Sequence, residues 1–199
     1  MSYLVATFEN YHNGERSLIC KASGDKMIVF AIDPGNTESA YCVMNDQFKL
    51  MEFAKLPNDE VMSCMKRWQN KEIQDRPGII VIERVASYGM AVGREVFETC
   101  EWIGRYTQAA LENAPVEYIY RKDEKVYLCG DMRAKDSNIR QALIDRFAKF
   151  DYKNGRGTKN KPDYFYGVSK DVWAAIAIAV TYYDMQLNKM LRENKHEEN

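Results

Sequence analysis

Residues 28–44, IVFAIDPGNTESAYCVM, constrain the fold of this chain more than any other segment. They begin with five apolar residues, which predict a strand buried on both faces of a sheet. Asp33 follows directly, and because a carboxylate cannot stay unpaired in such an interior, we expect it at the strand end, facing a cleft or a cation. A Pro-Gly turn then reverses the chain, and the alternating residues 40–44 predict a second, antiparallel strand.

A second short apolar segment, residues 79–82, also ends in an acid, Glu83. Its composition predicts a central strand with helices over both sheet faces, reached from the first strands by a helical crossover. If it lies beside the first strand, Asp33 and Glu83 meet at the same edge of the sheet. Two adjacent carboxylates repel each other unless a cation lies between them. The alternative is that Glu83 only pairs with Arg84 or Arg94.

The hydrophobic pattern of the remaining chain predicts the element order β-β-β-α-β-α-β-α-α. Further strands are expected at residues 48–54 and 115–120. Helices are expected after an N-cap at Asn58, over residues 93–113, over 138–150, and from 169 onward. The charged residues 121–125 should form an exposed connection.

At 199 residues the chain is long enough for one packed domain, and no Ser-, Pro- or Gly-rich linker divides it. We expect residues 27–190 to form this domain, 1–26 to form an N-terminal extension with a hairpin turn at Asn13-Gly14, and 191–199 to form a charged tail. The five cysteines include no CxxC pair, which is typical of reduced thiols and offers no zinc site. Neither a signal peptide nor a membrane-spanning segment is recognisable, so we expect a soluble, cytoplasmic protein.

Basic residues are concentrated between the last two predicted helices, although the 28 basic and 29 acidic residues of the chain nearly cancel. Within residues 151–167, which we call the basic loop, four cations are framed by tyrosine and phenylalanine: Lys153, Arg156, Lys159 and Lys161. This combination suits contact with a sugar-phosphate backbone and unstacked bases. A solvated surface loop is the alternative.

The last predicted helix carries a third acid near its start. Its first turns are rich in alanine, so the helix can lie close against the sheet. Asp171, in the first of these turns, is then near the strand ends that carry Asp33 and Glu83.

These features resemble the RNase H-like superfamily and, within it, the RuvC-type Holliday junction resolvases, in particular the small resolvase-like nucleases of bacteriophages. The resemblance covers residues 27–184. It rests on the segments IVFAIDPGNTESAYCV, IIVIERV, GDMRAKDSNIRQALIDRF and KDVWAAIAIAVTYYD. It implies an α/β fold with a mixed five-stranded sheet, three antiparallel strands followed by parallel strands, flanked by helices.

The resemblance also implies a catalytic site. Asp33 matches the catalytic Asp of the family's first strand, and Glu83 matches its fourth-strand Glu. With Asp171 they would bind two Mg²⁺ ions, replaceable by Mn²⁺, that hydrolyse a DNA phosphodiester. Asp33 would bridge both ions. The family usually has a second acid or a His–Asp pair at three-residue spacing here, but Ala174 stands three residues after Asp171.

The missing fourth ligand could come from elsewhere, such as Asp136 or Asp163. The resemblance further implies a homodimer that cuts branched DNA, with an interface on the helix over 93–113, where Gly104 interrupts the apolar face. Four residues would contact the junction outside the basic loop: Tyr88 as a wedge, and Lys122, Lys125 and Lys135 at the phosphates.

Three other functions remain open. A junction-binding protein with weak or no catalysis would explain Ala174. An RNase H-like nuclease for flaps or RNA–DNA hybrids would use the same acids. An actin-like ATPase also opens with a strand and a polar hairpin, but a second phosphate-binding motif is not recognisable downstream.

Overall fold

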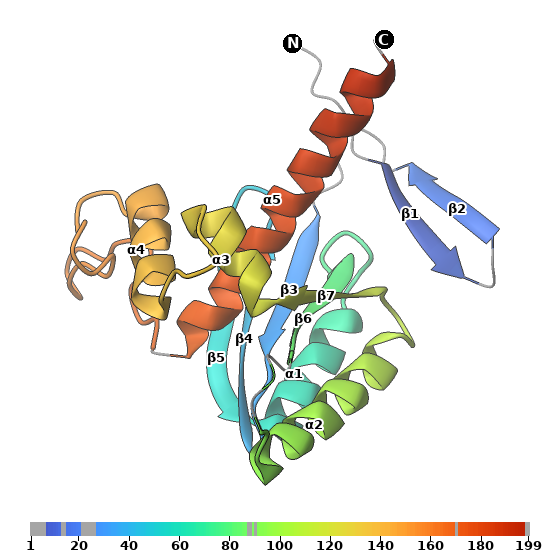
Figure 1. The fold of residues 1–199 in the computed structure, drawn as a ribbon, viewed down its shortest axis with the longest axis horizontal. Helices are drawn as coiled ribbons and strands as arrows, with labels where there is room; N and C mark the ends of the chain where they lie inside the picture. Colours follow the sequence, from blue (N-terminus) through green and yellow to red (C-terminus); the bar gives the residue numbers. More distant parts are fainter. Residues whose placement is uncertain are drawn as a thin grey trace.

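The computed structural model describes residues 7–12, 15–20, 27–86, 89, 91–169 and 171–197. At its centre is a five-stranded sheet with the strand order β5-β4-β3-β6-β7 (Figure 1). The strands are β3 (Ile28–Asp33), β4 (Glu38–Asn45), β5 (Leu50–Pro57), β6 (Ile79–Arg84) and β7 (Val116–Tyr120). Strands β3, β4 and β5 are antiparallel, whereas β6 and β7 run parallel to β3. The predicted mixed sheet is confirmed.

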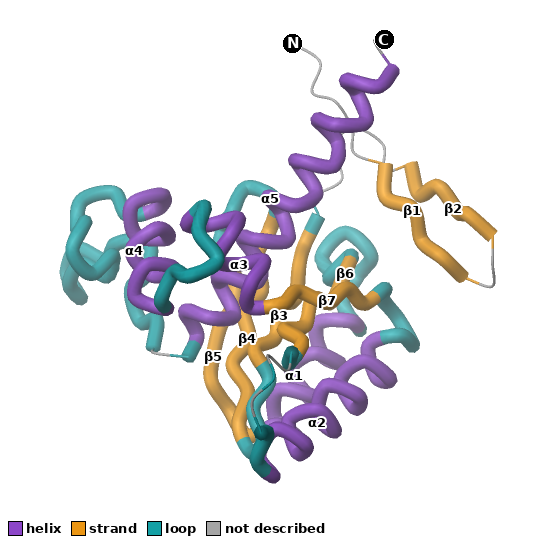
Figure 2. The backbone as a smooth tube through the Cα atoms, in the orientation of Figure 1, coloured by secondary structure: helices purple, strands orange, loops and turns teal. Residues whose placement is uncertain are grey.

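Helices cover both faces of this sheet (Figure 2). Helices α1 (Asn58–Gln69) and α2 (Arg94–Ala110) pack on one face. Helices α3 (Arg121–Cys129), α4 (Asp136–Phe147) and α5 (Val172–Glu197) lie on the other. The central strands are therefore buried on both sides, as their continuous apolar sequences predict.

Alternation along the strands decides on which face the strand-end acids lie. Side chains point to opposite faces at successive positions, and every second residue of β3 and β6 belongs to the core under α5: Val29, Ala31, Ile79 and Val81. Asp33 and Glu83 are the next residues of these two rows. Because the parallel register pairs Ile32 with Ile82, the two acids end up as neighbours on the α5 side of the sheet.

Several predicted boundaries differ from the structure. Strand β5 covers residues 50–57 instead of 48–54, because the Asn45 side chain accepts the amides of Gln47 and Lys49 and extends the turn before it. Asn58 is not the N-cap of α1, a position that Pro57 takes. The Asn58 side chain instead accepts a hydrogen bond from Ser39 Oγ at 2.6 Å.

The prediction for residues 121–125 is wrong. These residues form the first turns of α3 and do not make an exposed connection. The Asp123 carboxylate accepts the Tyr120 amide at 3.0 Å and so begins the helix, while Leu128 packs against the core. Glu124, one turn before Leu128, is thereby carried into the interior and is completely buried.

The two ends of the chain also have regular structure. Strands β1 (Thr7–His12) and β2 (Glu15–Cys20) form a separate two-stranded antiparallel sheet. Its expected turn, Asn13-Gly14, lies outside the described residues. Helix α5 continues to Glu197, so most of the expected tail is helical. No helix in the described ranges has the length and apolar character needed to cross a membrane.

Candidate active site

The carboxylates of Asp33 and Glu83 lie side by side at the ends of β3 and β6, close enough to share a hydrogen bond. Burial raises the pKa of Asp33 well above its usual range, and the charge of Glu83 raises it further. Arg121, on α3, acts in the opposite direction. Two acids held in this way favour a proton or a cation between them.

The alternative partners of Glu83 are engaged elsewhere. Arg94 pairs with Glu98 at 2.6 Å, and the Arg84 guanidinium lies over the ring of Tyr118. Across the described residues, neither arginine forms an ion pair with Glu83. Glu83 is therefore available to the site.

Glu124 is a third acid near this pair, and the sequence reasoning missed it. Its Oε2 accepts a hydrogen bond from Arg121 Nη1 at 2.6 Å. Its Oε1 is buried and has no hydrogen-bond partner in the part of the chain that the structure describes. Burial raises the pKa of Glu124, and the charges of Glu83 and Asp33 add to this. The spacing from Glu124 to Leu128, one helical turn, is the signal that would have placed it inward.

Asp171, the third predicted acid, lies at the exposed rim of the site. Its carboxylate is 2.6 Å from Lys55 Nζ, which also contacts Glu38 at 3.2 Å, and its side chain is 48% exposed. It is near enough to Asp33 to contribute, as the smallest of several causes, to the raised pKa of that acid. The structure thus brings Asp33 and Glu83 together, and it places Asp171 on the same cavity as Asp33 with its carboxylate paired to Lys55.

A cavity of about 580 Å³ opens over Asp33 between α3, α4 and α5. Asp171 and Ala174 line it on the α5 side. Three cations line the remaining wall: Arg121, Arg140 and Lys153. Two buried donors beside it, Arg140 Nε and Trp173 Nε1, have no acceptor among the described residues. A cavity with carboxylates at one end and cations with unpaired donors around it is suited to a phosphate group.

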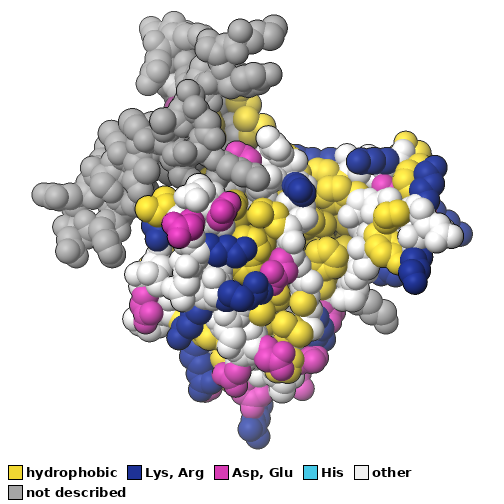
Figure 3. Space-filling model, turned by 180° about the vertical axis from the view of Figure 1, so that it is seen from behind, with side chains coloured by type: hydrophobic (Ala, Val, Ile, Leu, Met, Phe, Trp, Pro, Cys, Tyr) yellow, Lys and Arg dark blue, Asp and Glu magenta, His cyan; other side chains and the backbone are white. Residues whose placement is uncertain are grey.

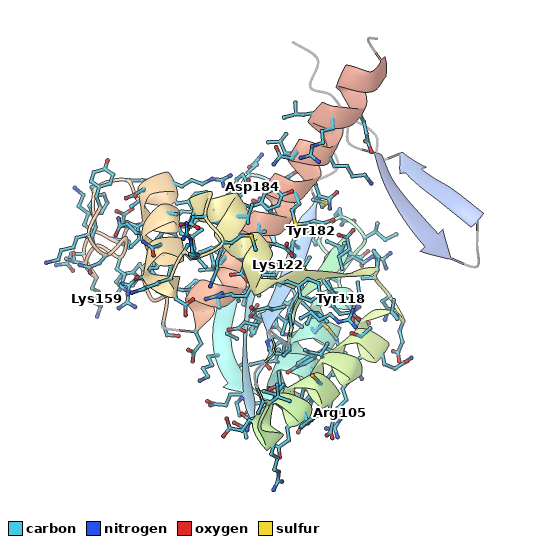
Figure 4. The ribbon with its side chains drawn as sticks, in the orientation of Figure 1. Arg105, Tyr118, Lys122, Lys159, Tyr182 and Asp184 are labelled. Atoms are coloured by element: carbon cyan, nitrogen blue, oxygen red, sulfur yellow. The ribbon has the colours of Figure 1, made fainter. Side chains whose placement is uncertain are left out.

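The other predicted contact residues are spread more widely. Lys122 is exposed on α3 and Lys159 lies at the outer end of the basic loop (Figure 4), while Lys125 is half-buried and Lys135 is exposed. Tyr88 lies outside the described residues. Lys and Arg side chains gather along the edge formed by α4 and this loop (Figure 3). Of the predicted basic residues, Lys153 is the one that lines the cavity.

The basic loop is built around two buried or half-buried aspartates. Asp163 accepts the amides of Lys149, Phe150, Asp151 and Tyr164, all within 3.0 Å. Asp151 accepts those of Asn154, Arg156 and Gly157. Arg156 Nη2 donates to the Val168 carbonyl at 2.6 Å, so this predicted DNA contact has a structural partner. Both oxygens of Asp163 are engaged, which disfavours it as the missing metal ligand. Asp136, 80% exposed, is paired with Arg121.

We predict that Asp163→Asn loosens this loop. Although burial raises the pKa of Asp163, its backbone hydrogen bonds outweigh that effect and hold the pKa below the usual range. An amide would lose part of these bonds, so protection of the Phe150 and Asp151 amides from hydrogen exchange should fall about 30-fold, equivalent to about 2 kcal/mol.

The pH dependence provides the check on this prediction. A carboxylate with a depressed folded-state pKa stabilises the loop above its unfolded pKa, near 3.9, and this contribution is lost as the pH falls toward the folded value. Wild-type protection should therefore decline below about pH 4, and that of Asp163→Asn should decline much less. Identical profiles would contradict the role of the charge.

The acids gathered at the ends of β3 and β6, Asp33, Glu83 and the nearby Glu124, form what we call the strand-end site. Their carboxylates suit a hard divalent cation. The ligands of this site are carboxylate oxygens, and the free oxygen of Glu124 is a buried acceptor without a donor among the described residues. Within the described ranges, no three acidic, histidine or cysteine side chains already converge as metal ligands. The acids would therefore have to draw together around the ion.

Comparison with solved structures identifies the fold. The structure is similar to that of Thermus thermophilus RuvC, with a TM-score of 0.55 and 19% sequence identity over 81% of this chain and 97% of that chain. T. thermophilus RuvC in complex with a Holliday junction substrate gives a TM-score of 0.56 and 18% identity over 81% and 96% of the two chains. No protein-family model and no curated protein sequence matches the chain. The chain has an RNase H-like fold, as predicted from the sequence.

Proposed function

We propose that this protein is a metal-dependent endonuclease that resolves four-way or otherwise branched DNA junctions. The observation that carries the proposal is the Asp33–Glu83 pair at two adjacent strand ends, of which Asp33 lines a cavity with a cationic wall. The RNase H-like fold and the likeness to a RuvC structure with bound Holliday junction support it. The resemblance of KDVWAA and the basic loop to bacteriophage resolvases leads us to propose a phage-encoded enzyme acting in the host cytoplasm.

Asp33, Glu83 and Asp171 would hold the metal. Two Mg²⁺ ions, or two Mn²⁺ ions in their place, would activate the attacking water and stabilise the leaving oxygen. Asp33, which lies beside Glu83 and lines the cavity with Asp171, would hold the metal together with both acids, and Asp171 would have to leave Lys55. Arg121, Arg140 and Lys153 hold the scissile phosphate and neutralise the charge that develops on it. The enclosing helices α3, α4 and α5 orient the phosphate over Asp33.

Cleavage of synthetic substrates tests this proposal. A four-way junction, a flap, a linear duplex and an RNA–DNA hybrid are incubated with Mg²⁺ or Mn²⁺. We expect paired cuts in the junction and much slower cutting of linear duplex. Preferred cutting of flaps or hybrids would reassign the substrate, and absence of cutting with either ion would refute the nuclease.

A junction-binding protein with little catalysis is the second candidate. Two observations favour it: Ala174 stands where a further acid is expected, and Lys55 occupies the carboxylate of Asp171. Tight junction binding without metal-dependent cleavage would identify this function.

Two lysines of the loop are expected to differ in their effect. Lys153 lines the cavity and Lys159 lies at the outer end of the loop. Lys153→Ala should lower the single-turnover cleavage rate at saturating DNA about 10-fold, because it removes a charge beside the reacting phosphate. Lys159→Ala, its matched control, should weaken binding and reduce the salt slope by about one while sparing that rate. Equal loss of rate in both variants would contradict the assignment.

We also propose a homodimer through the outer face of α2, because a junction has two strands to cut symmetrically. Phe97, Gly104 and Leu111 are exposed at seven-residue spacing on α2 and the turn after it; Phe97 is 60% exposed. A Cβ on Gly104 would meet open space among the described residues, so this glycine does not pack against that part of the chain. Helix α2 and the turn after it thus present exposed apolar positions, among charged and polar residues, that a second copy can bury.

Phe97→Glu is expected to dissociate this dimer. A carboxylate at this position would be buried in the dimer without a partner, so sedimentation at micromolar concentration should change from dimer to monomer. Leu187→Glu, at an exposed apolar position on α5, is the matched control and should leave the dimer intact. A monomeric wild type, or a dimeric Phe97→Glu, would contradict the interface.

A further inference from the structure

Glu124 is a buried acid that the proposed chemistry has not yet used. Helix α3 begins directly after β7, and the parallel register pairs Ile119 of β7 with Glu83 of β6. The first turns of α3 therefore start beside the carboxylate pair. Glu124 accepts a hydrogen bond from Arg121, which lines both the cavity that contains Asp33 and a smaller pocket that contains Glu83, so Glu124 lies on the site side of α3.

The hydrogen bonds of Glu124 are incomplete. Arg121 Nη1 donates to Oε2 at 2.6 Å, while Oε1 is buried without a partner in the described part of the chain. An acid needed only to pair with Arg121 would gain from placing both oxygens on that guanidinium, whose Nη2 instead bonds Asp136 at 2.8 Å. A free, fully buried carboxylate oxygen is unfavourable unless something electropositive binds it.

The α5 side of the cavity contributes one acid, Asp171, among its described lining residues. Ala174 lines the cavity together with Asp171 and Asp33, one helical turn after Asp171. An acid at that position would have contributed a further carboxylate from α5. The chain has a methyl group there and an unpaired carboxylate oxygen on α3.

We propose that Glu124 is the fourth carboxylate of the metal site, replacing from α3 the acid that position 174 does not supply. The inference rests on the proposed metal-dependent function. Arg121 is then a positioning residue, because it holds Oε2 of Glu124 and leaves Oε1 free for the ion. The chain keeps a complete acidic set by using two helices in place of one.

Mn²⁺ binding to the full-length chain, measured by calorimetry and by the electron paramagnetic resonance signal of free Mn²⁺, tests the inference. Wild type should bind two ions, and Asp33→Asn should lose both. Glu124→Gln keeps the shape and an acceptor for Arg121, and it should weaken at least one ion 10-fold or more. Unchanged affinity and stoichiometry in Glu124→Gln would overturn the inference, whereas absence of Mn²⁺ binding in wild type would overturn the proposed function itself.

A second variant does not depend on a change in the buried acid. Ala174→Asp in the otherwise wild-type chain adds an acid on α5. If Glu124 already completes the site, Ala174→Asp should bring no gain in Mn²⁺ affinity. A gain of 10-fold or more would show that the site lacked a ligand and would overturn the inference. In the Glu124→Gln background the same change should restore the lost Mn²⁺ affinity. Failure to restore it would contradict the inference that Glu124 replaces an acid at position 174.

Discussion

Asp33→Asn is expected to lower the rate of junction cleavage by at least about 10³-fold while junction affinity changes less than about 3-fold. Asp33 lies beside Glu83 and also lines the cavity, so its carboxylate is the proposed ligand whose loss should weaken metal binding most. The proposed phosphate contacts come from Arg and Lys side chains and would remain. Single-turnover cleavage and binding to the same four-way junction, with Ca²⁺ in place of Mg²⁺ for the binding measurement, separate the two effects.

The control and a second readout sharpen this prediction. Asp136→Asn, at the exposed rim of the same cavity, should leave most of the rate. Without metal, Asp33→Asn should not lower the melting temperature, because burial and Glu83 already disfavour a charge at this position. Cleavage at the wild-type rate, or a variant that fails to bind DNA, would contradict the role given to Asp33.

Arg121→Met is the second substitution expected to have a large effect, lowering the free energy of unfolding by about 3 kcal/mol. Arg121 is the ion-pair partner of the completely buried Glu124, at 2.6 Å. Its loss would leave a carboxylate buried beside Glu83 without any cation. The measurement is urea unfolding of the wild type and of Arg121→Met in the absence of divalent ions.

A double substitution separates the ion pair from simple packing. In Arg121→Met/Glu124→Leu both charges are replaced by apolar groups, so most of the lost stability should return. A double variant as unstable as Arg121→Met would show that the guanidinium acts by packing alone. Cleavage should be lost in both variants, because the first lacks a cation at the phosphate and the second also lacks an acid.

The sheet could be predicted because its strands are short, continuously apolar and each closed by an acid or a turn. Residues 28–33 and 79–83 predict the two central parallel strands. Because side chains alternate between the two faces along each strand, Asp33 and Glu83 lie on one face. Such patterns depend only on local sequence and on the alternation of strand side chains.

The rest of the site depends on contacts that local sequence does not record. The charged residues 121–125 read as exposed, yet α3 turns Glu124 inward because Leu128, one turn later, packs on the core. Asp171 was expected in the first turn of the last helix but directly precedes α5, and the sequence does not show that Lys55, on β5, holds its carboxylate. Arg140 joins the cavity because α4 packs beside α5, where its guanidinium lies over the Trp173 ring.

Occupancy of the strand-end site by metal tests the central proposal most directly. Crystals of the full chain soaked in Mn²⁺ and measured at an anomalous wavelength would locate the ions without reference to activity. We predict two anomalous peaks. One should lie between Asp33 and Glu83, within reach of Glu124, and the other between Asp33 and an Asp171 that has been released from Lys55. Crystals saturated with Mn²⁺ that show no peak at the ends of β3 and β6 would contradict the proposal.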